Sequence, residues 1–236
     1  MRAVDLLVVG AGPAGCAAAR RTAPGLRILV VDAARFPRDK PCGGALTSGG
    51  LRELDLAGLA LRVPHATASH AVLRVDGRSL RVPLPRPAAV VRRLERDQDL
   101  DAGPAGYAWR FPCLVAGAPA ESVGIYSMES TPAPSAALVH WMECDGLAPP
   151  EPAGAARAGA AAWSLRLWDP GGPVGLPGAL LAGEALGADP LAGEGIRYAL
   201  WSGRLAGEVA ARALARGEAP SPRLLLRYRA FRRAPP

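Results

Sequence analysis

Residues 5–32 read DLLVVGAGPAGCAAARRTAPGLRILVVD, and this segment defines the architecture that we expect for the chain. The nearly continuous apolar run over residues 5–9 predicts a parallel strand that is buried on both faces. A GxGxxG motif follows at residues 10–15 and opens a run of small residues that predicts a helix. A second apolar run, Ile28–Val31, ends on Asp32. This order of strand, glycine turn, helix, strand and acid predicts a dinucleotide-binding unit.

Each part of the motif has a physical role at a dinucleotide. Gly10 permits the tight turn, Gly12 lets the backbone approach a pyrophosphate, and Gly15 lets helix and strand pack closely. The helix N-terminus, near Pro13–Ala14, offers unpaired N–H groups to the phosphates. Asp32, about 20 residues after the glycines, is placed to accept a hydrogen bond from a ribose hydroxyl. The motif alone does not distinguish FAD from NAD.

Composition narrows the class of protein. The chain has 236 residues, which suits one large domain or two small ones, and 50% of them are apolar, enough for a sizeable core. Its net charge is +7, but the arginines are spread along the chain, so we expect no nucleic-acid partner. The four cysteines show no CxxC pair or metal-ligand spacing and are interpreted as reduced thiols, with no metal site.

The N-terminal residues show no signal peptide, and no apolar run reaches the roughly 18 residues of a membrane-spanning helix. We therefore expect a cytoplasmic protein, with attachment to a membrane surface as the alternative. The arginine-rich residues 222–233 bear on this choice, because Leu224, Tyr228 and Phe231 would share one helical face. That face either docks on the nucleotide-binding domain or contacts an anionic membrane.

A second glycine-rich segment, residues 183–196, reads GEALGADPLAGEGI. The short apolar run before it, within residues 178–183, predicts a third buried parallel strand. A long helix is expected after it, because small residues recur there at helical spacing and suit close packing. These residues are Ala199, Leu200, Gly203, Ala206, Gly207 and Ala210.

Residues 32–44, DAARFPRDKPCGG, and residues 183–196 resemble segments of geranylgeranyl-reductase-type flavoproteins, within the broader group shaped like p-hydroxybenzoate hydroxylase. The resemblance implies FAD as the cofactor, with NADPH or another electron donor. It implies that a Cys-Gly-Gly loop lies near the flavin. It also implies that the acid after the first glycine of residues 183–196 binds the ribityl or pyrophosphate part of FAD. The loop that follows would lie over the flavin ring, and the next helix would point its N-terminus at that ring. The positions that match are Cys42, Gly43, Gly44, Gly183, Glu184 (where the family has Asp), Asp189, Gly193, Gly195 and Ile196.

Residues 90–100, VVRRLERDQDL, resemble the helix by which the family returns to the flavin domain. The resemblance places Arg93 near the cofactor phosphates or ribose. The residues alone also fit an ordinary ion pair between Arg93 and Asp97 on a helix surface. The family's third parallel strand, β-meander and Ala-Asp-Gly motif do not follow, so we expect the chain to be truncated relative to the family by a large internal deletion. Sheet edges would then need an oligomer or another partner to cover them.

Residues 106–112, GYAWRFP, resemble a strand of the family's substrate region. Tyr107, Trp109 and Phe111 alternate and would point to one face of a strand, either as a core wall or as the lining of an apolar chamber. The resemblance favours a chamber for a small apolar prenyl substrate. A hairpin is also expected around Asp76-Gly77, and a helix over residues 134–147.

The expected fold class is α/β: a Rossmann-like FAD/NAD(P)-binding domain with a parallel sheet, interrupted by a small antiparallel-sheet substrate region. The FAD-binding domain is assigned residues 1–62, a returning helix at 90–105 and the C-terminal part 178–236. The substrate region is assigned a hairpin at 63–89 and further strands and a helix at 106–177.

The resemblance implies an FAD-dependent oxidoreductase that reduces a carbon–carbon double bond of a prenyl substrate by hydride transfer from reduced flavin. Cys42 is the family-derived candidate for a catalytic group beside the flavin. Two alternatives stay open. One is a monooxygenase or halogenase of the same superfamily, and the other is a truncated, non-catalytic homologue.

Overall fold

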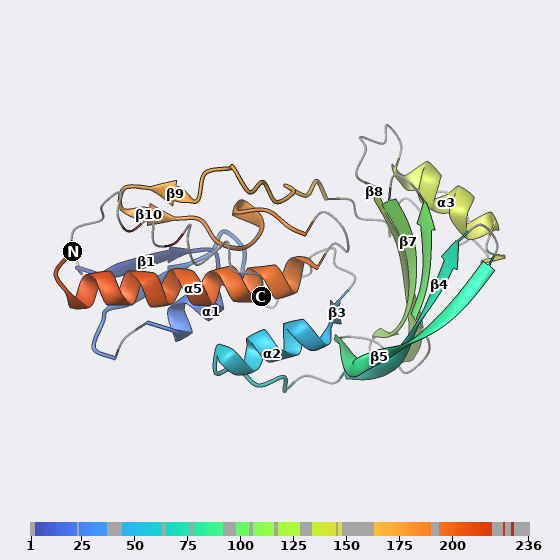
Figure 1. The fold of residues 1–236 in the computed structure, drawn as a ribbon, viewed down its shortest axis with the longest axis horizontal. Helices are drawn as coiled ribbons and strands as arrows, with labels where there is room; N and C mark the ends of the chain where they lie inside the picture. The colour runs from blue at the N-terminus through green and yellow to red at the C-terminus, as the bar shows by residue number, and fades with distance from the viewer. Residues whose placement is uncertain are drawn as a thin grey trace. The chain divides into compact units, whose positions relative to one another are not determined.

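The structure is a computed structural model in which the chain forms two compact units (Figure 1). Unit 1 comprises residues 1–38, 49–62 and 165–236, and unit 2 comprises residues 39–48 and 63–164. The residues that the structure describes are 3–22, 24–36, 44–62, 65–75, 78–91, 98–103, 106–115, 118–127, 134–144, 146–147, 163–189, 194–218, 224 and 228.

Unit 1 contains the predicted strand–helix–strand. Strands β1 (Leu6–Val9) and β2 (Ile28–Val31) pair in parallel, and helix α1 (Pro13–Arg20) lies between them in the chain. A salt bridge supports the start of this pair, because Asp5 accepts hydrogen bonds from the Arg27 guanidinium at 2.9 Å and from the Arg27 backbone N–H at 2.8 Å.

The expectation that both faces of the first strand, β1, are buried is wrong. The register places Leu7 opposite Leu29 and Val9 opposite Val31, so these four side chains share one face. Their exposed fractions are 52%, 46%, 80% and 39%, respectively. The reason is that β1 and β2 form a sheet of two strands, with α1 against one face, whereas double burial needs a covering layer on each side.

Helix α5 (Gly195–Ala215) packs closely against α1, as the stripe of small residues predicts. A Cβ atom at Gly203 would collide with the carbonyl of Ala14, and one at Gly207 would collide with the carbonyl of Ala18. Gly203 and Gly207 are four residues apart, as are their partners Ala14 and Ala18, and both pairs follow the chain in the same order. The two helices are therefore parallel. Because Gly203 lies opposite Ala14 and a helix rises about 1.5 Å per residue, the N-terminal end of α5 extends about 10 Å beyond that of α1.

The segment before α5 differs from the expected third parallel strand. Strand β10 (Ala179–Leu180) pairs antiparallel with β9 (Gly175–Leu176), and Gly183–Ala185 form a short 3-10 helix, η1. A local turn explains the difference, because Gly178 has a φ of +87° and folds the chain back on the preceding residues.

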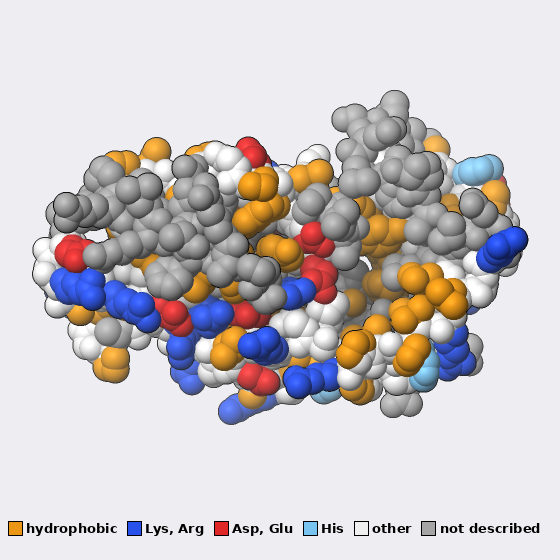
Figure 2. Space-filling model, viewed as in Figure 1, with side chains coloured by type: hydrophobic (Ala, Val, Ile, Leu, Met, Phe, Trp, Pro, Cys, Tyr) orange, Lys and Arg blue, Asp and Glu red, His pale blue; other side chains and the backbone are white. Residues whose placement is uncertain are grey.

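Ion pairs tie helix α2 (Ser48–Leu56) and α1 to α5. Arg204 of α5 lies 3.0 Å from Glu53 of α2 and 3.4 Å from Glu208, which in turn lies 3.0 Å from Arg21 after α1. The Glu53 and Arg204 side chains are 6% and 14% exposed, so this pair is well buried. Burial lowers the pKa of Arg204, but its bonds to Glu53 and Glu208 raise it more, so the guanidinium stays charged. Figure 2 shows acidic and basic side chains mixed over this face of unit 1.

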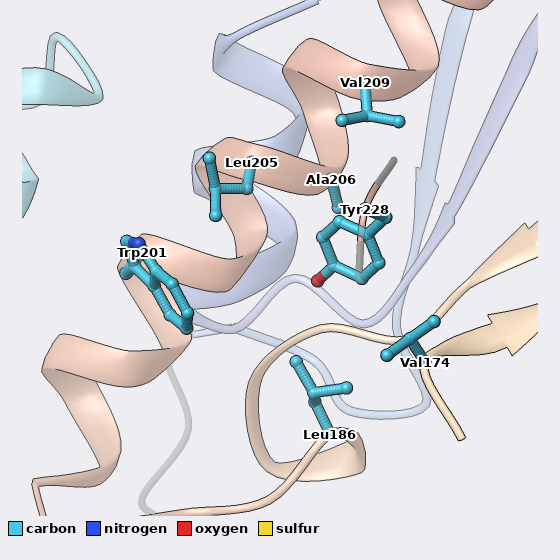
Figure 3. Packing of buried hydrophobic residues seen from close by; sticks show 7 residues of the cluster. All are labelled: Val174, Leu186, Trp201, Leu205, Ala206, Val209 and Tyr228. Atoms are coloured by element: carbon cyan, nitrogen blue, oxygen red, sulfur yellow. The ribbon is translucent and has the colours of Figure 1, made fainter. Parts of the chain in front are cut away.

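An apolar cluster fills the other side of α5 (Figure 3). Its buried members are Val174, Leu186, Trp201, Leu205, Ala206, Val209 and Tyr228, and Leu224 packs against them. Leu224 and Tyr228 of the C-terminal tail therefore use the predicted apolar face to dock on unit 1. Phe231 lies outside the described residues.

Unit 2 is built on a mixed sheet of six strands in the order β3-β5-β4-β6-β7-β8. The strands are β3 (Ala45–Leu46), β4 (His65–Val75), β5 (Arg78–Val91), β6 (Gln98–Gly103), β7 (Gly106–Val115) and β8 (Ala118–Ser127). The pairs β4–β5 and β7–β8 are antiparallel, and the first of them confirms the hairpin expected around Asp76-Gly77. Helix α3 (Pro134–Cys144) follows as expected.

The helix expected over residues 90–105 is not present where the structure describes this segment. Val91 ends β5, and residues 98–103 form β6, which pairs in parallel with β4 and antiparallel with β7. Residues 98–103 form a strand because β4 and β7 pair with its two edges, and this pairing outweighs the local helical pattern. The boundary of the second substrate segment also differs, since unit 1 resumes at residue 165 rather than 178.

Replacing Gly203 by Ala tests the helix contact. Since the added methyl group meets the Ala14 carbonyl, we expect the free energy of unfolding to fall by about 1–3 kcal/mol in chemical denaturation. Gly195→Ala in the same helix is the control, because no atom lies within 4 Å of its added Cβ, and it should change stability by less than about 1 kcal/mol. Equal losses in the two variants would contradict tight packing at Gly203.

The Asp5–Arg27 pair predicts an acid-sensitive contact. Hydrogen bonding from Arg27 lowers the pKa of Asp5 from 3.8 to about 2. The pair's contribution to stability is therefore full above pH 3.8 and is lost as pH falls through about 2. An NMR titration should give a pKa near 2 for Asp5 in the native chain and a value near 3.8 in Arg27→Gln. Arg52→Gln, at an exposed position of α2, should leave it unchanged, and an Asp5 pKa near 3.8 in the native chain would refute the contact.

Candidate dinucleotide-binding site

The glycine turn between β1 and α1 has the geometry that the sequence predicts. Gly10 has a φ of +101°, and its N–H donates to the Val31 carbonyl at 2.7 Å. A Cβ at Gly15 would collide with the Gly10 carbonyl, so only glycine lets α1 start this close to the turn. Gly12 has a φ of −73°, which any residue adopts, yet no atom of the described residues lies within 4 Å of its Cβ position. Its backbone therefore borders open space.

The start of α1 is suited to an anion. No side chain caps it, Pro13 occupies its first turn, and no acidic residue lies in that turn. The first N–H groups of a helix lack partners within the helix and carry the positive end of its dipole. A phosphate in front of Gly12 would therefore meet N–H donors, with no acidic side chain in the first turn of α1 itself.

Asp32 links the end of β2 to the glycine turn. Its carboxylate accepts the Ala11 N–H at 2.7 Å and the Ala34 N–H at 2.8 Å, one at each oxygen. These two bonds hold the Asp32 carboxylate at the end of β2, beside the glycine turn. The predicted ribose contact stays a prediction.

The structure brings the second glycine segment beside the first. Gly183 has a φ of +64°, and a Cβ there would lie 2.8 Å from the Ala14 Cβ and 3.6 Å from the Ala199 Cβ. The Gly183 N–H donates to the Ser202 hydroxyl at 2.8 Å, which fixes η1 on α5. Two segments about 170 residues apart in sequence therefore meet at the N-terminus of α1.

Polar residues follow from η1 into the first turn of α5. Glu184 and Asp189 are both half-buried, and Glu194 binds Arg197 at 2.9 Å. Burial raises the pKa of Tyr198, and the Asp189 carboxylate raises it further, so this phenol stays protonated at neutral pH. Gly195 is exposed and Ile196 half-buried at the helix start.

Several predicted site residues cannot be placed. Cys42, Gly43, Arg93 and Gly193 lie outside the described residues, so their assignments stay predictions. Gly44 is described, with a φ of +75°, and belongs to unit 2.

The aromatic residues of β7 form one face of the unit 2 sheet, as alternation predicts. The ring centroids of Tyr107 and Trp109 are 6.0 Å apart, and those of Trp109 and Phe111 are 6.2 Å apart. Tyr126 of β8 joins them, with its ring 5.3 Å from that of Tyr107. Gly124 lies opposite Trp109, and a Cβ there would collide with the indole, so the glycine makes room for it.

Two residues that sequence reasoning did not assign to the site contact the second segment. They are Ser202, which accepts the Gly183 N–H, and Tyr228, which donates to the Leu181 carbonyl at 2.8 Å. A serine inside a stripe of small residues was the available signal for Ser202, because serines within helices often bond to nearby backbone. Tyr228 was recognised only as part of an apolar face.

The arrangement fits a dinucleotide. Open space in front of Gly12, an uncapped helix start and a carboxylate at the end of β2 match the pyrophosphate and ribose of such a ligand. Among the described residues, no group of three or more His, Cys, Asp or Glu side chains is placed to bind a metal ion. Within the same residues, no helix has the length and apolar character needed to cross a membrane.

Comparison of sequences finds partial relatives. No protein-family model matches the chain. Over 84 residues the chain is 46% identical to menaquinone reductase of Mycolicibacterium smegmatis, a match covering 35% of this chain and 20% of that protein. Over 56 residues it is 57% identical to menaquinone reductase of Mycobacterium tuberculosis, covering 23% of this chain and 14% of that protein. The matches thus span a fifth or less of these curated relatives.

Comparison of structures covers nearly the whole chain. A geranylgeranyl bacteriochlorophyll reductase-like protein of Thermoplasma acidophilum superposes with a TM-score of 0.74 at 18% identity, over 97% of this chain and 82% of that one. A flavoprotein/dehydrogenase of Cytophaga hutchinsonii gives 0.59 at 15% identity, over 96% and 82%. The p-nitrophenol 4-monooxygenase of Pseudomonas putida gives 0.53 at 13%, over 94% and 82%.

The chain has the fold of FAD-binding, Rossmann-type flavoproteins. The predicted fold class is therefore confirmed, and so is the predicted resemblance to geranylgeranyl-reductase-type flavoproteins. The substrate and the reaction are not fixed by this fold, because one flavoprotein fold supports several chemistries.

Asp32→Asn tests the link between β2 and the glycine turn. One backbone N–H would face an amide group in place of a carboxylate oxygen, so we expect a loss of about 1–2 kcal/mol in the free energy of unfolding. Asp55→Asn, at an exposed position of α2, is the control and should change stability by less than about 0.5 kcal/mol. The link would be refuted if both variants were as stable as the native chain.

Proposed function

We propose that this chain binds FAD and acts as an FAD-dependent oxidoreductase that reduces a carbon–carbon double bond of a prenyl substrate. The observation that carries the proposal is the meeting of Gly183 with Ala14 at an uncapped helix start, because it joins both glycine segments into one elongated site. The sequence similarity to menaquinone reductases and the structural similarity to a geranylgeranyl bacteriochlorophyll reductase-like protein support the same class.

In this proposal different groups of described residues bind different parts of FAD. The glycine turn and the start of α1 bind the pyrophosphate, and Asp32 accepts a ribose hydroxyl. Glu184, after Gly183, binds the ribityl part. The N-terminal end of α5 lies about 10 Å beyond that of α1, and its positive end there stabilises negative charge on the ring.

Reduced flavin, when bound, supplies the hydride that adds to one carbon of the double bond. A proton must reach the other carbon, and Cys42 is the family-derived candidate for a group beside the flavin. NADPH or another two-electron donor restores the reduced cofactor. We further propose that the aromatic face formed by Tyr107, Trp109 and Phe111 binds the apolar chain of the substrate, because rings of this kind offer large apolar surface.

A monooxygenase of the same superfamily is the second candidate, since p-nitrophenol 4-monooxygenase is among the structural neighbours. A truncated homologue that lacks catalytic activity is the third, because unit 1 holds a parallel sheet of two strands only among its described residues. Under any of these, we propose a cytoplasmic location and an oligomer or partner that covers the exposed sheet. We also propose peripheral membrane contact through residues 222–233 other than Leu224 and Tyr228, which are docked on unit 1.

Binding of FAD is tested with Gly12→Ala. The backbone at Gly12 accepts alanine, and in the part of the chain that the structure describes the added methyl group meets no atom, so the variant should be as stable as the native chain. The methyl group would instead occupy the space of the pyrophosphate, and we expect the Kd for FAD to rise at least about tenfold, or about 1.4 kcal/mol. Titration of the ligand-free protein, followed by flavin absorbance, measures this.

Gly171→Ala is the control, because Gly171 is exposed and lies away from the glycine turn in sequence. It should bind FAD like the native chain. A native chain that takes up no FAD would contradict both enzyme proposals and leave the non-catalytic homologue. If FAD binds, the reductase and the monooxygenase are distinguished after the flavin has been reduced by light without oxygen. A menaquinone with an unsaturated prenyl chain is then added. Oxidation of the flavin, together with loss of one double bond from the menaquinone in mass spectrometry, supports the reductase. Rapid oxidation by oxygen that is coupled to hydroxylation supports the monooxygenase.

A further inference from the structure

The C-terminal tail reaches the second cofactor segment through one buried side chain. Tyr228 is 0% exposed, and its hydroxyl donates to the Leu181 carbonyl at 2.8 Å, with the Ser202 carbonyl at 3.2 Å as a second acceptor. Figure 3 shows its ring against α5, between Ala206 and Val174. The Tyr228 hydroxyl therefore links Leu181, which comes shortly before Gly183, to Ser202 of helix α5, against which Gly183 packs.

The same helix residue holds Gly183 from the other side. The Ser202 hydroxyl accepts the Gly183 N–H at 2.8 Å and donates to the Tyr198 carbonyl at 2.6 Å. Ser202 is 2% exposed, so both bonds are shielded from water. Ser202 thus links the tail to the turn beside Ala14, because its carbonyl accepts from Tyr228 and its hydroxyl accepts from Gly183.

Packing alone does not require this hydroxyl. The neighbours of Tyr228 in the cluster are apolar, and a phenylalanine would fill nearly the same volume without a polar atom to satisfy. The Tyr228 hydroxyl instead fixes the position of the backbone, because it bonds to the Leu181 and Ser202 carbonyls, which lie on either side of the Gly183 turn. The turn has little freedom elsewhere, since Gly183 has a φ of +64° and lies against Ala14 and Ala199.

We propose that Tyr228 is a positioning residue for the cofactor site. It holds the Gly183 turn in the place where that turn and the start of α1 bind one ligand, so the C-terminal tail is part of the binding site without touching the cofactor. This inference rests on the proposed binding of FAD and goes beyond it, because it assigns a role to a residue 45 positions away from Gly183 in the sequence.

Tyr228→Phe is the direct test, with Val209→Ala as the matched control. Both changes weaken the same buried cluster, but only the first removes the bonds to Leu181 and Ser202. We expect the Kd for FAD to rise about three- to tenfold in Tyr228→Phe and to stay within twofold of the native value in Val209→Ala. The visible circular dichroism of bound flavin should change in Tyr228→Phe alone, because the turn beside the cofactor shifts.

Ser202→Ala extends the test along the same set of bonds. It should weaken FAD binding as Tyr228→Phe does, and the double variant should lose less than the product of the two single effects, because both act on the Gly183 turn. Thermal unfolding of each ligand-free variant shows that it is folded before binding is measured.

The outcomes separate the two proposals. FAD uptake by the native chain with an equal Kd in Tyr228→Phe and Val209→Ala, whether both changed or both native-like, would overturn the positioning role and leave FAD binding intact. Independent, multiplicative effects of Ser202→Ala and Tyr228→Phe would also overturn it. No FAD uptake by the native chain, with all variants folded, would overturn the proposed function and the positioning role with it.

Discussion

The contact between α1 and α5 is the constraint on which unit 1 depends. Gly203 and Gly207 let the backbones of the two helices approach so closely that no side chain fits between them. Because the Gly183 N–H bonds to Ser202 of α5, this contact also sets where Gly183 lies against Ala14. The N-terminus of α1 and the second glycine segment are therefore brought together by helix packing, and the candidate site follows from that packing rather than from a broad sheet.

Ion pairs on one side of α5 and an apolar cluster on the other hold the neighbouring elements in place, as further strands would in a wider sheet. On one side, the buried Arg204–Glu53 pair and Glu208 tie α2 and α1 to α5. On the other side, the apolar cluster with Tyr228 joins the C-terminal tail to the same helix. A buried ion pair adds little net stability but is costly to break, so it favours one arrangement of the helices over others. What stays uncovered is one face of β1 and β2, which is where we propose that a partner binds.

Sequence reasoning succeeded where the signal is local. The glycine turn, the stripe of small residues in α5 and the alternating aromatics of β7 each follow from the spacing of neighbouring residues. It failed where the partner of a segment decides the outcome. Residues 98–103 read QDLDAG, which has low strand propensity, and they become β6 because β4 and β7 pair with both edges. The apolar run before Gly183 does not reveal that Gly178 turns it back on β9.

The central claim is that two segments about 170 residues apart form one dinucleotide site. Hydrogen–deuterium exchange with and without FAD tests it most directly. The account predicts that FAD slows amide exchange in residues 10–15 and in residues 183–187 together, at the same FAD concentration, because both segments contact the same ligand. Protection of one segment alone, or of neither at saturating FAD, would contradict it.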